Sequence, residues 1–331
     1  MKIAVIIPAY NAEATLGLCL ERLLANQGPA FDILVVDDAS QDGTRAVARR
    51  YPCTLIPMEQ NGGPGAARNA GAARSQADLL LFLDADCAAP LDWVARYAHL
   101  FAAHSDMACI CSGYNTALTH SFWARFQYRD TLYNQQFTPR HPRWASSCNF
   151  GCRREAFWRA GGFPEIYLNE DMEFFYFLTE TDRILWEPTL GAGHHFHTTM
   201  RAYARQQRGW GASVVETYMK YPPIFFAEGT VDQTGLSGQL ALTGCIPIGL
   251  ALLFVDVGWG VLLLLGLLGG ILGLNIQFLQ YLKANESQGF CFRAVPAILL
   301  RNGVWFTGML HAALRNFRRW PAFVRYGLTR R

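Results

Sequence analysis

The first hundred residues alternate between short apolar runs and stretches with helical periodicity, and this alternation restricts the fold more than any other feature. Strands that are apolar throughout are buried on both faces, and helical crossovers between them indicate a parallel sheet. We therefore predict an α/β fold with a mostly parallel sheet. The predicted strands are Ile3–Ile7, Ile33–Val36, Thr54–Ile56 and Leu79–Leu83, and the predicted helices are Thr15–Asn26, Gly43–Arg50 and Gly65–Arg74.

Polar side chains follow three of these strands. Tyr10 comes after the first strand, Asp38 ends the second, and Asp84 and Asp86 follow the fourth. Ligands of parallel sheets bind beyond the carboxyl ends of the strands, so we expect these side chains to meet at one edge. An Asp at a strand end can also cap a helix, and for any one of them alone this is the favoured alternative. Three converging groups favour a binding site.

The composition changes after Leu236. The chain of 331 residues is 51% apolar and 17% charged, and the apolar excess lies mainly in two uncharged stretches, 233–255 and 257–282. Each exceeds the roughly 20 residues that span a bilayer, although buried helices of a soluble core are the alternative. We predict a catalytic domain over residues 1–228 and a membrane-associated helical region over residues 229–331.

The sequence after the second stretch predicts an orientation in the membrane. A third span through residues 294–314 would carry Arg301 into the bilayer and export a basic tail, and both are unfavourable. We expect an interfacial helix over 292–318, a turn near Asp256 on the outer side, and a cytoplasmic catalytic domain at a cell inner membrane. We assign the tail to anionic lipid rather than to nucleic acid. It has no acidic residue and contains Arg315, Arg318, Arg319, Arg325, Arg330 and Arg331.

The cysteines and the N-terminus agree with a cytoplasmic location. None of the nine cysteines forms a C-x-x-C pair, so we interpret them as reduced, buried thiols. The N-terminal apolar run is interrupted by Pro8 and Asn11 too early for a signal peptide. This run is better explained as a buried first strand.

Four segments, VIIPAYN, ILVVDDASQDGT, NGGPGAARNAGAARSQADLLLFLDADC and NEDMEFF, occur in an order that resembles the family 2 glycosyltransferases. The resemblance covers about residues 2–215. It implies a GT-A fold and an enzyme that transfers a sugar, with inversion, from a nucleotide-diphosphate donor. A D-x-D triplet alone is common by chance, so the weight rests on the four segments together.

The chemistry of sugar transfer explains why such an enzyme would carry strand-end carboxylates. The departing nucleoside diphosphate develops negative charge, which a divalent cation neutralises, and Asp oxygens suit Mg²⁺ or Mn²⁺. The resemblance implies that Asp86 binds the metal and that Asp84 contacts the ribose or the metal shell. From the segment GAGHHFH we choose His195 as a further metal ligand, with His194 and His197 left as alternatives.

The resemblance also assigns contacts to the donor. Asp38 would accept a hydrogen bond from the base, which favours a uridine-diphosphate sugar, and Pro8 and Tyr10 would frame that base. Asn61 and Arg68 match positions that contact the nucleotide. Arg68 lies near a predicted helix start, where anions are favoured, although an ordinary surface position is the alternative.

The predicted catalytic pair is Glu170 and Asp171, where Asp171 matches the family's base for the acceptor hydroxyl. The alternative is a charge pair in the first turn of a helix, where acidic residues are favoured. Further on, RQQRGWG resembles the Gln-x-x-Arg-Trp motif of processive members with altered spacing. Arg208 and Trp210 are therefore candidates for contact with the acceptor or the diphosphate, and processive synthesis is in doubt.

Three functional hypotheses remain. The Asp-Ala-Asp triplet is followed by Cys-Ala-Ala-Pro rather than the Leu-Gln typical of dolichyl-phosphate mannose synthases. This favours the first hypothesis, an enzyme that transfers the sugar to a hydroxyl of a membrane-borne glycan or lipid-linked acceptor. The second hypothesis is an enzyme that transfers it to polyprenyl phosphate. The third is a non-catalytic, membrane-tethered protein that binds nucleotide-sugars. The presence of Asp38, Asp84, Asp86 and Asp171 together argues against this third hypothesis.

Overall fold

A computed structural model describes residues 1–164, 170–222 and 236–329, which form two compact units. The first unit comprises residues 1–119 and 138–196, and the second comprises residues 120–137 and 197–331. The division therefore differs from a single boundary near residue 228. Helices α5 (Phe122–Gln135) and α8 (Met200–Lys220) belong to the second unit because their aromatic side chains, such as Phe126 and Tyr203, pack with Phe278 and Phe290 of the C-terminal helices.

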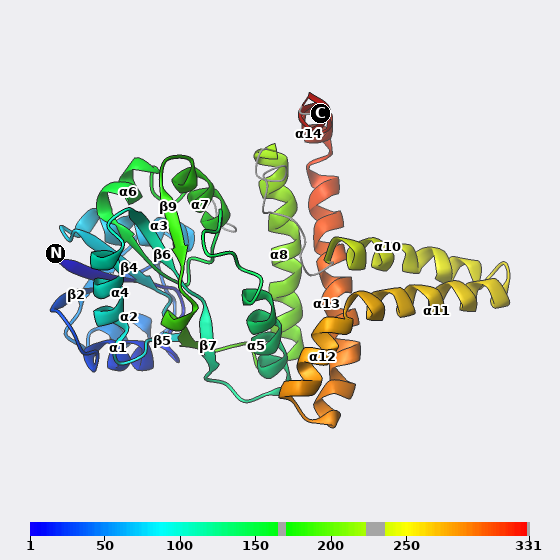
Figure 1. Cartoon of the computed structure of the whole chain (residues 1–331), viewed down its shortest axis with the longest axis horizontal. Coiled ribbons are helices and arrows are strands. Elements are labelled where there is room, and N and C mark those ends of the chain that lie inside the picture. The colour runs from blue at the N-terminus through cyan, green and yellow to red at the C-terminus, as the bar shows by residue number, and fades with distance from the viewer. Residues whose placement is uncertain (165–169, 223–235, 330–331) are drawn as a thin grey trace. The chain divides into compact units, whose positions relative to one another are not determined.

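The first unit (Figure 1) is built on a seven-stranded sheet, and its strands have the order β3-β2-β1-β4-β8-β6-β9. Strand β8 is antiparallel to both of its neighbours, and the other six strands run in one direction. This confirms the predicted α/β fold. The strands are β1 Ile3–Ala9, β2 Phe31–Asp37, β3 Thr54–Pro57, β4 Leu79–Leu83, β6 Met107–Cys111, β8 Asn149–Arg153 and β9 Arg183–Trp186.

A second, three-stranded sheet has the order β5-β10-β7. Strand β5 follows β4 closely in the chain, and it pairs antiparallel with β10, so that His194 lies opposite Cys87. This pairing brings the segment after the Asp84–Asp86 triplet beside the histidine-rich segment. The strands are β5 Cys87–Ala88, β7 Tyr114–Ala117 and β10 Ala192–His194, and the 3₁₀ turn η1, Pro188–Leu190, precedes β10.

Helices cover both faces of the large sheet because successive strand residues point to opposite sides. In β1, Ile3, Val5 and Ile7 pack in one core cluster with α1, α2 and α4, whereas Ala4 and Ile6 pack in the other with α3, α6 and α7. The helices of this unit are α1 Leu16–Leu24, α2 Thr44–Ala48, α3 Gly63–Arg74, α4 Trp93–Ala103, α6 Arg154–Arg159 and α7 Glu170–Thr181.

Helix α3 lies unusually close to the sheet and to α7, and two glycines allow it. A Cβ atom on Gly71 would lie 2.5 Å from Cγ2 of Ile6, and one on Gly65 would lie 3.0 Å from Cγ of Glu170. These positions explain part of the glycine- and alanine-rich segment before the Asp84–Asp86 triplet. The close approach places the first turn of α3 beside the first turn of α7.

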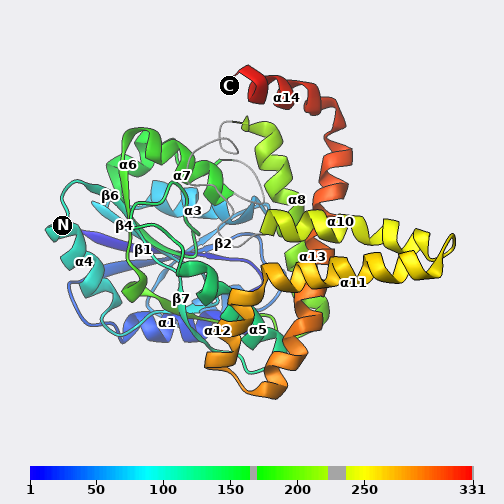
Figure 2. The same ribbon diagram turned by 45° about the vertical axis from the view of Figure 1, so that its right-hand side comes forward.

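The second unit is helical. Helices α8 and α13 pack backbone to backbone, since a Cβ atom on Gly211 would lie 2.6 Å from the carbonyl oxygen of Trp305 and one on Gly308 would collide with the carbonyl of Arg208. Figures 1 and 2 both show these two helices side by side. The remaining elements of the unit are α10 Leu236–Leu252, α11 Val257–Leu274, α12 Ile276–Asn285, α13 Gln288–Arg315, η2 Phe317–Arg319 and α14 Trp320–Thr329.

Helices α10 and α11 form an apolar hairpin. Among the described residues one helix, Val257–Leu274, is long and apolar enough to cross a membrane, with a mean hydropathy of 2.2; Ser237–Leu252 is a shorter apolar helix. Glycines allow close packing in the hairpin, because a Cβ atom on Gly249 would lie 2.7 Å from Leu264. The second predicted stretch, 257–282, is divided between α11 and α12, since α11 ends at Leu274 and the chain turns at Asn275.

Candidate active site

Asp38 is buried just beyond the carboxyl end of β2. Its carboxylate oxygens accept hydrogen bonds from the backbone N–H groups of Gly62 at 2.7 Å and Gly63 at 2.9 Å. The side-chain amide of Asn61 donates to the Asp38 carbonyl at 3.2 Å. Asp38 therefore caps α3, the structural role expected of a single strand-end Asp. Each carboxylate oxygen retains a second lone pair, so the cap does not prevent a further hydrogen bond.

Two loops beside Asp38, residues 10–13 and 39–44, are joined by reciprocal hydrogen bonds, and we call them the two-loop bracket. The backbone N–H of Asn11 donates to Oγ of Ser40 at 3.0 Å, and the backbone N–H of Gln41 donates to Oδ1 of Asn11 at 2.9 Å. Asn11 and Ala39 have φ values of 48° and 58°. Non-glycine residues seldom adopt this left-handed conformation, so both loops are held in a defined and strained shape.

Acidic side chains complete the two-loop bracket. The backbone N–H of Glu13 donates to Asp42 at 3.1 Å, and Oε2 of Glu13 accepts from the backbone N–H of Gly43 at 3.0 Å. The predicted donor residue Tyr10 is exposed at the start of this bracket, whereas Pro8 is buried within β1. Glu13 and Asp42 were not among the residues predicted from the sequence. They could have been found because each lies in the loop after a predicted strand, and the two strands are neighbours in the sheet.

Arg68 is not a surface residue. It is 2% exposed in α3 and bridges two carboxylates, with Nη2 2.6 Å from Oδ1 of Asp84 and Nη1 2.9 Å from Oε1 of Glu170. Its guanidinium also lies 5.2 Å from the ring centre of Phe163, and its Nε has no hydrogen-bond partner. Arg68 thus fixes Asp84 and Glu170 next to each other. Burial raises the pKa of Asp84 above its usual value, although the ion pair with Arg68 opposes this.

Asp86 lies against the histidine segment. Its Oδ2 is 3.3 Å from Nε2 of His194, and its carbonyl accepts from the backbone N–H of His195 at 3.0 Å. Burial raises the pKa of Asp86, but the imidazole of His194 outweighs this effect and holds that pKa below its usual value. The His194 ring is fixed between Tyr114 and Phe196, with ring centres 4.2 and 4.4 Å away.

His195, the histidine chosen from the sequence, contacts Asp86 through its backbone, whereas His194 contacts it through its ring. Burial lowers the pKa of His195 and so favours its neutral imidazole, although Asp86 opposes this effect. Nε2 of His195 and Nδ1 of His194 are buried without a hydrogen-bond partner. Within residues 1–164, 170–222 and 236–329 no group of three or more potential ligand side chains is arranged around a metal position. A carboxylate beside unpaired imidazole nitrogens nevertheless suits a divalent cation that takes further ligands from a bound diphosphate.

Glu170 and Asp171 begin α7, and acidic residues are favoured in the first turn of a helix. Glu170 is buried against Arg68, whereas Asp171 is partly exposed. Burial and the adjacent Glu170 raise the pKa of Asp171 to about 7. At neutral pH the Asp171 carboxyl can therefore both accept and release a proton, which is the property of a general base. Residues 165–169, which precede this pair in the family-like segment, lie outside the described residues.

Not all the predicted residues belong to the first unit. Arg208 and Trp210 lie on α8, and Trp210 is exposed. His197, the remaining histidine alternative, begins the second unit. The residues that the first unit brings together are therefore the Arg68–Asp84–Glu170 cluster with Asp171, the Asp86–His194 pair with His195, and the Asp38 cap with Asn61.

Residues 4–161 match the family described as glycosyl transferase family 2. Glycosyltransferase AglE of Haloferax volcanii is 38% identical over 102 residues, which are 28% of this chain and 33% of that protein. The undecaprenyl-phosphate 4-deoxy-4-formamido-L-arabinose transferase of Pseudomonas paraeruginosa is 36% identical over 114 residues, 32% of this chain and 34% of that protein. The chain thus spans about a third of the length of these relatives.

The fold is also found in solved structures. A mannosyltransferase from Pyrobaculum calidifontis, solved with GDP-mannose and Mn²⁺, superposes with a TM-score of 0.58 at 17% identity. The match covers 96% of this chain and 87% of that one. At this identity the likeness concerns the fold.

Proposed function

We propose that the protein transfers a sugar, with inversion, from a nucleotide-diphosphate donor to a hydroxyl of a membrane-borne glycan or lipid-linked acceptor, because residues 4–161 match glycosyl transferase family 2. We favour a uridine-diphosphate sugar as the donor. The base would lie against Tyr10 and Pro8 and would bond to Asp38, with Asn61 and Arg68 near the nucleotide.

The observation that carries this proposal is the buried negative charge of the first unit. Asp84 and Glu170 share the single guanidinium of Arg68, and Asp171 adds a third carboxyl group beside them. Burying like charges without compensation is unfavourable, so such a cluster is a sign of function rather than of stability. It favours a ligand that brings positive charge or gives up a proton to the cluster.

Asp171 supplies the proton acceptor in this proposal. As the acceptor hydroxyl attacks the sugar carbon, its proton passes to the carboxylate of Asp171, and the nucleoside diphosphate leaves from the opposite face. Glu170 is held by Arg68 and acts on Asp171 through charge, raising its pKa towards that of a base useful at neutral pH. Glu170 is therefore a positioning residue here.

A divalent cation, Mg²⁺ or Mn²⁺, would neutralise charge on the leaving diphosphate when bound. Asp86 would hold it together with His195 or His194, whose unpaired nitrogens support this assignment. The solved mannosyltransferase with GDP-mannose and Mn²⁺ supports the class of ligand. Asp84 is paired with Arg68, and a bound donor would compete with it for this arginine. Asp84 would then be able to contact the ribose or the metal shell.

A second candidate acceptor is polyprenyl phosphate, which the name of one relative favours. The two acceptors place different demands on Asp171. A hydroxyl must lose a proton during attack, whereas a phosphate oxygen is already anionic and needs no base. Substituting Asp171 should therefore strongly reduce transfer to a hydroxyl and leave transfer to polyprenyl phosphate largely intact.

The deciding experiment is a donor screen by thermal shift with Mn²⁺, because a bound ligand raises apparent stability by mass action. We expect one nucleotide-sugar to raise the melting temperature in the wild-type protein and to lose this effect when Mn²⁺ is chelated. The matched variant is Asp86→Ala, and Asp92→Ala, an exposed acidic residue before α4, is the control. Full activity of Asp86→Ala in the presence of chelator would remove the metal role.

We also propose that the α10–α11 hairpin anchors the protein in a cell inner membrane, with the catalytic unit on the cytoplasmic side. The side chains at its turn are strongly exposed, with Phe254 at 93% and Trp259 at 67%. Between Gln239 and Asn275 the only charged residue is Asp256, which caps α11 at the turn. Protease cleavage near Asp256 from the cytoplasmic side of sealed vesicles would contradict this orientation.

A further inference from the structure

Helix α13 carries an exposed apolar stripe on one face. Phe292, Leu310 and Leu314 are exposed and recur at spacings close to whole helical turns, so they lie on the same side of the helix. Phe292 is 82% exposed and Leu314 is 66% exposed, and Phe317, just beyond the helix, is 71% exposed. Large apolar side chains exposed on one side, at the start and towards the end of a helix of 28 residues, are more than the scattered exposure of an ordinary surface.

The stripe faces the side on which the hairpin leaves the unit. Phe306, on the same face of α13 by helical spacing, packs against α10, since a Cβ atom on Gly244 would lie 2.7 Å from its ring. Figures 1 and 2 both show the α10–α11 hairpin extending away from α13, across its axis. If the hairpin enters a bilayer, α13 therefore lies along the surface of that bilayer with its stripe towards the lipid.

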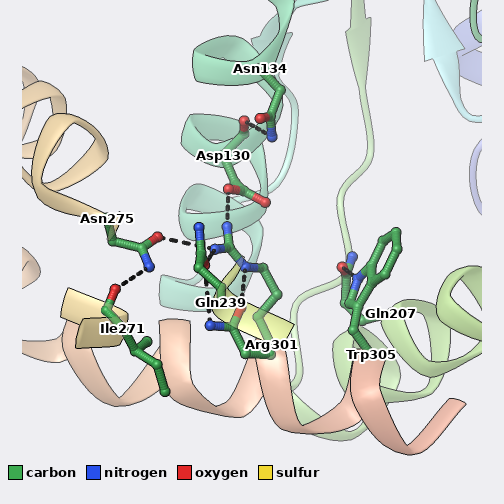
Figure 3. Close-up of polar contacts among 9 residues, drawn as sticks. Asp130, Asn134, Gln207, Gln239, Ile271, Asn275, Arg301 and Trp305 are labelled. Atoms are coloured by element: carbon green, nitrogen blue, oxygen red, sulfur yellow. Dashed lines mark hydrogen bonds and ion pairs between the residues drawn. The ribbon is translucent and has the colours of Figure 1, made fainter. Parts of the chain in front are cut away.

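The opposite face of α13 carries a charged residue, Arg301, and its side chain is buried within the unit. Figure 3 shows Arg301 pointing to Asp130 of α5, Gln239 of α10 and Asn275, which joins α11 and α12. Nη2 of Arg301 lies 3.1 Å from Oε1 of Gln239 and 3.2 Å from Oδ1 of Asn275. The amide of Asn302 donates to the same Gln239 oxygen at 3.1 Å. The arginine is neutralised inside the unit and does not oppose contact of the stripe with lipid.

The charge of this region matches one kind of lipid. No acidic residue occurs after Glu286, whereas four described arginines flank the end of the stripe. The short helix α14 continues the pattern, with Trp320 and Val324 exposed beside Arg325. An apolar stripe flanked by arginines and a tryptophan is typical of a helix that lies in the interface of an anionic membrane. The four arginines are Arg315, Arg318, Arg319 and Arg325.

We propose that α13 and α14 form an in-plane docking surface for anionic phospholipid, separate from the hairpin that anchors the protein. The stripe supplies apolar contact, and the arginines select membranes with negatively charged headgroups. The inference rests on the membrane anchor proposed above for its orientation, but not on the transfer reaction. It assigns to the C-terminal helices a preference for anionic lipid that the hairpin, which has no basic residue, does not provide.

Hydrogen exchange in nanodiscs tests the proposal with the full chain. The protein is reconstituted in discs of phosphatidylcholine alone or of phosphatidylcholine with phosphatidylglycerol, and exchange is followed by mass spectrometry. We expect peptides from the end of α13 and from α14 to exchange more slowly in the anionic discs. Peptides from the α10–α11 hairpin should be equally protected in both. Salt should reverse the difference, because it screens surface charge.

The variant Arg318→Gln/Arg319→Gln/Arg325→Gln should remove the preference for anionic discs. Each basic residue near such a surface contributes about 1 kcal/mol, so the docking equilibrium should fall on the order of a hundredfold. The control is Arg22→Gln/Arg49→Gln/Arg50→Gln, three exposed arginines of the first unit. The proposal would be overturned by any of three results. These are equal exchange in the two kinds of disc, an unchanged preference for anionic discs in the tail variant, and protection that appears only when an RNA oligonucleotide is added. Donor hydrolysis by the tail variant in detergent should equal that of the wild type, which separates this test from the reaction.

Discussion

Each unit of the molecule buries an arginine, and the two arginines differ in how their charge is balanced. Arg301 in the second unit meets one carboxylate, Asp130, and otherwise neutral amide oxygens. Arg68 in the first unit meets two carboxylates, with Asp171 close by and its own Nε unpaired. A cluster whose charges balance and whose hydrogen bonds are satisfied stabilises the fold. An excess of one buried charge instead indicates a site where a bound ligand or a proton supplies the missing charge.

The largest expected effect is on the reaction. Asp171→Asn removes the proton acceptor but keeps the shape of the side chain, so transfer to a hydroxyl should fall by about 10²- to 10⁴-fold. The melting temperature should not fall, because the amide carries no charge that must be buried. Steady-state transfer assays and thermal unfolding measure the two effects. Glu180→Gln, an exposed residue at the other end of α7, is the control. If Asp171→Asn were less stable but kept its specific activity, the cluster of Arg68, Asp84, Glu170 and Asp171 would have a structural role instead.

The second effect is on stability in the other unit. Arg301→Met leaves the carboxylate of Asp130 without its partner, and we expect a loss of about 3–5 kcal/mol in the free energy of unfolding. Combining it with Asp130→Leu should recover most of this loss, because the pair is then replaced by apolar groups. Denaturant unfolding in detergent measures both variants. If Arg301→Met alone were as stable as the wild type, the contrast between the two arginines would fail.

The third effect is on the pH profile. The pKa of Asp171 is raised to about 7, and a base must be deprotonated to act, so the transfer rate should rise with pH through about 7 and then level off. Glu170→Gln removes the adjacent like charge and should move this rise to lower pH. Because the folded-state pKa is raised, the protonated carboxyl favours folding below its ordinary pKa of about 3.9, and this contribution is lost as the pH rises through about 7. Activity and this part of stability therefore change in opposite directions. A rise with the same midpoint in Glu170→Gln would contradict the coupling.

The smallest effect concerns the strained two-loop bracket. Asn11→Ala and Asn11→Gly both lose the hydrogen bond from Gln41, but only alanine must hold a φ of 48° against a penalty of roughly 1–2 kcal/mol. We expect Asn11→Ala to raise the KM for the donor several-fold more than Asn11→Gly does, with little difference in kcat. Steady-state kinetics at varied donor concentration measures this. Equal KM values would show that the strain does not shape the donor site.

Much of the first unit was predictable because its strands and helices have strong local periodicity. The run Leu79–Leu83 matches β4 in both bounds, and the helical stretch Gly65–Arg74 lies within α3. The site was harder to predict because its contacts join residues far apart in the chain. Neither the ion pair of Arg68 with Glu170, 102 residues away, nor the contact of His194 with Asp86 leaves a local pattern. Both depend on sheet pairing and on the close approach of α3 to α7.

The second unit was less predictable for the same reason. Its apolar hairpin is evident from composition, but the predicted catalytic domain, residues 1–228, included α5, which lies between β7 and β8 in sequence. Its aromatic residues Phe126 and Tyr133 gave no sign of which partners would cover them. Arg301 argued against a third membrane span, but the sequence held no sign of its partner Asp130, which lies 171 residues earlier.

That separation of 171 residues also sets an order of events during synthesis. At about 5–20 residues per second, α5 leaves the ribosome on the order of ten seconds or more before Arg301 exists to pair with Asp130. During this interval the strands of the first unit can pair, while α5 has Phe126 and Tyr133 uncovered. In the nascent chain the strands of the first unit can therefore be paired while the aromatic side chains of α5 are still exposed. These side chains are covered only when the C-terminal helices, the last quarter of the chain, have been translated.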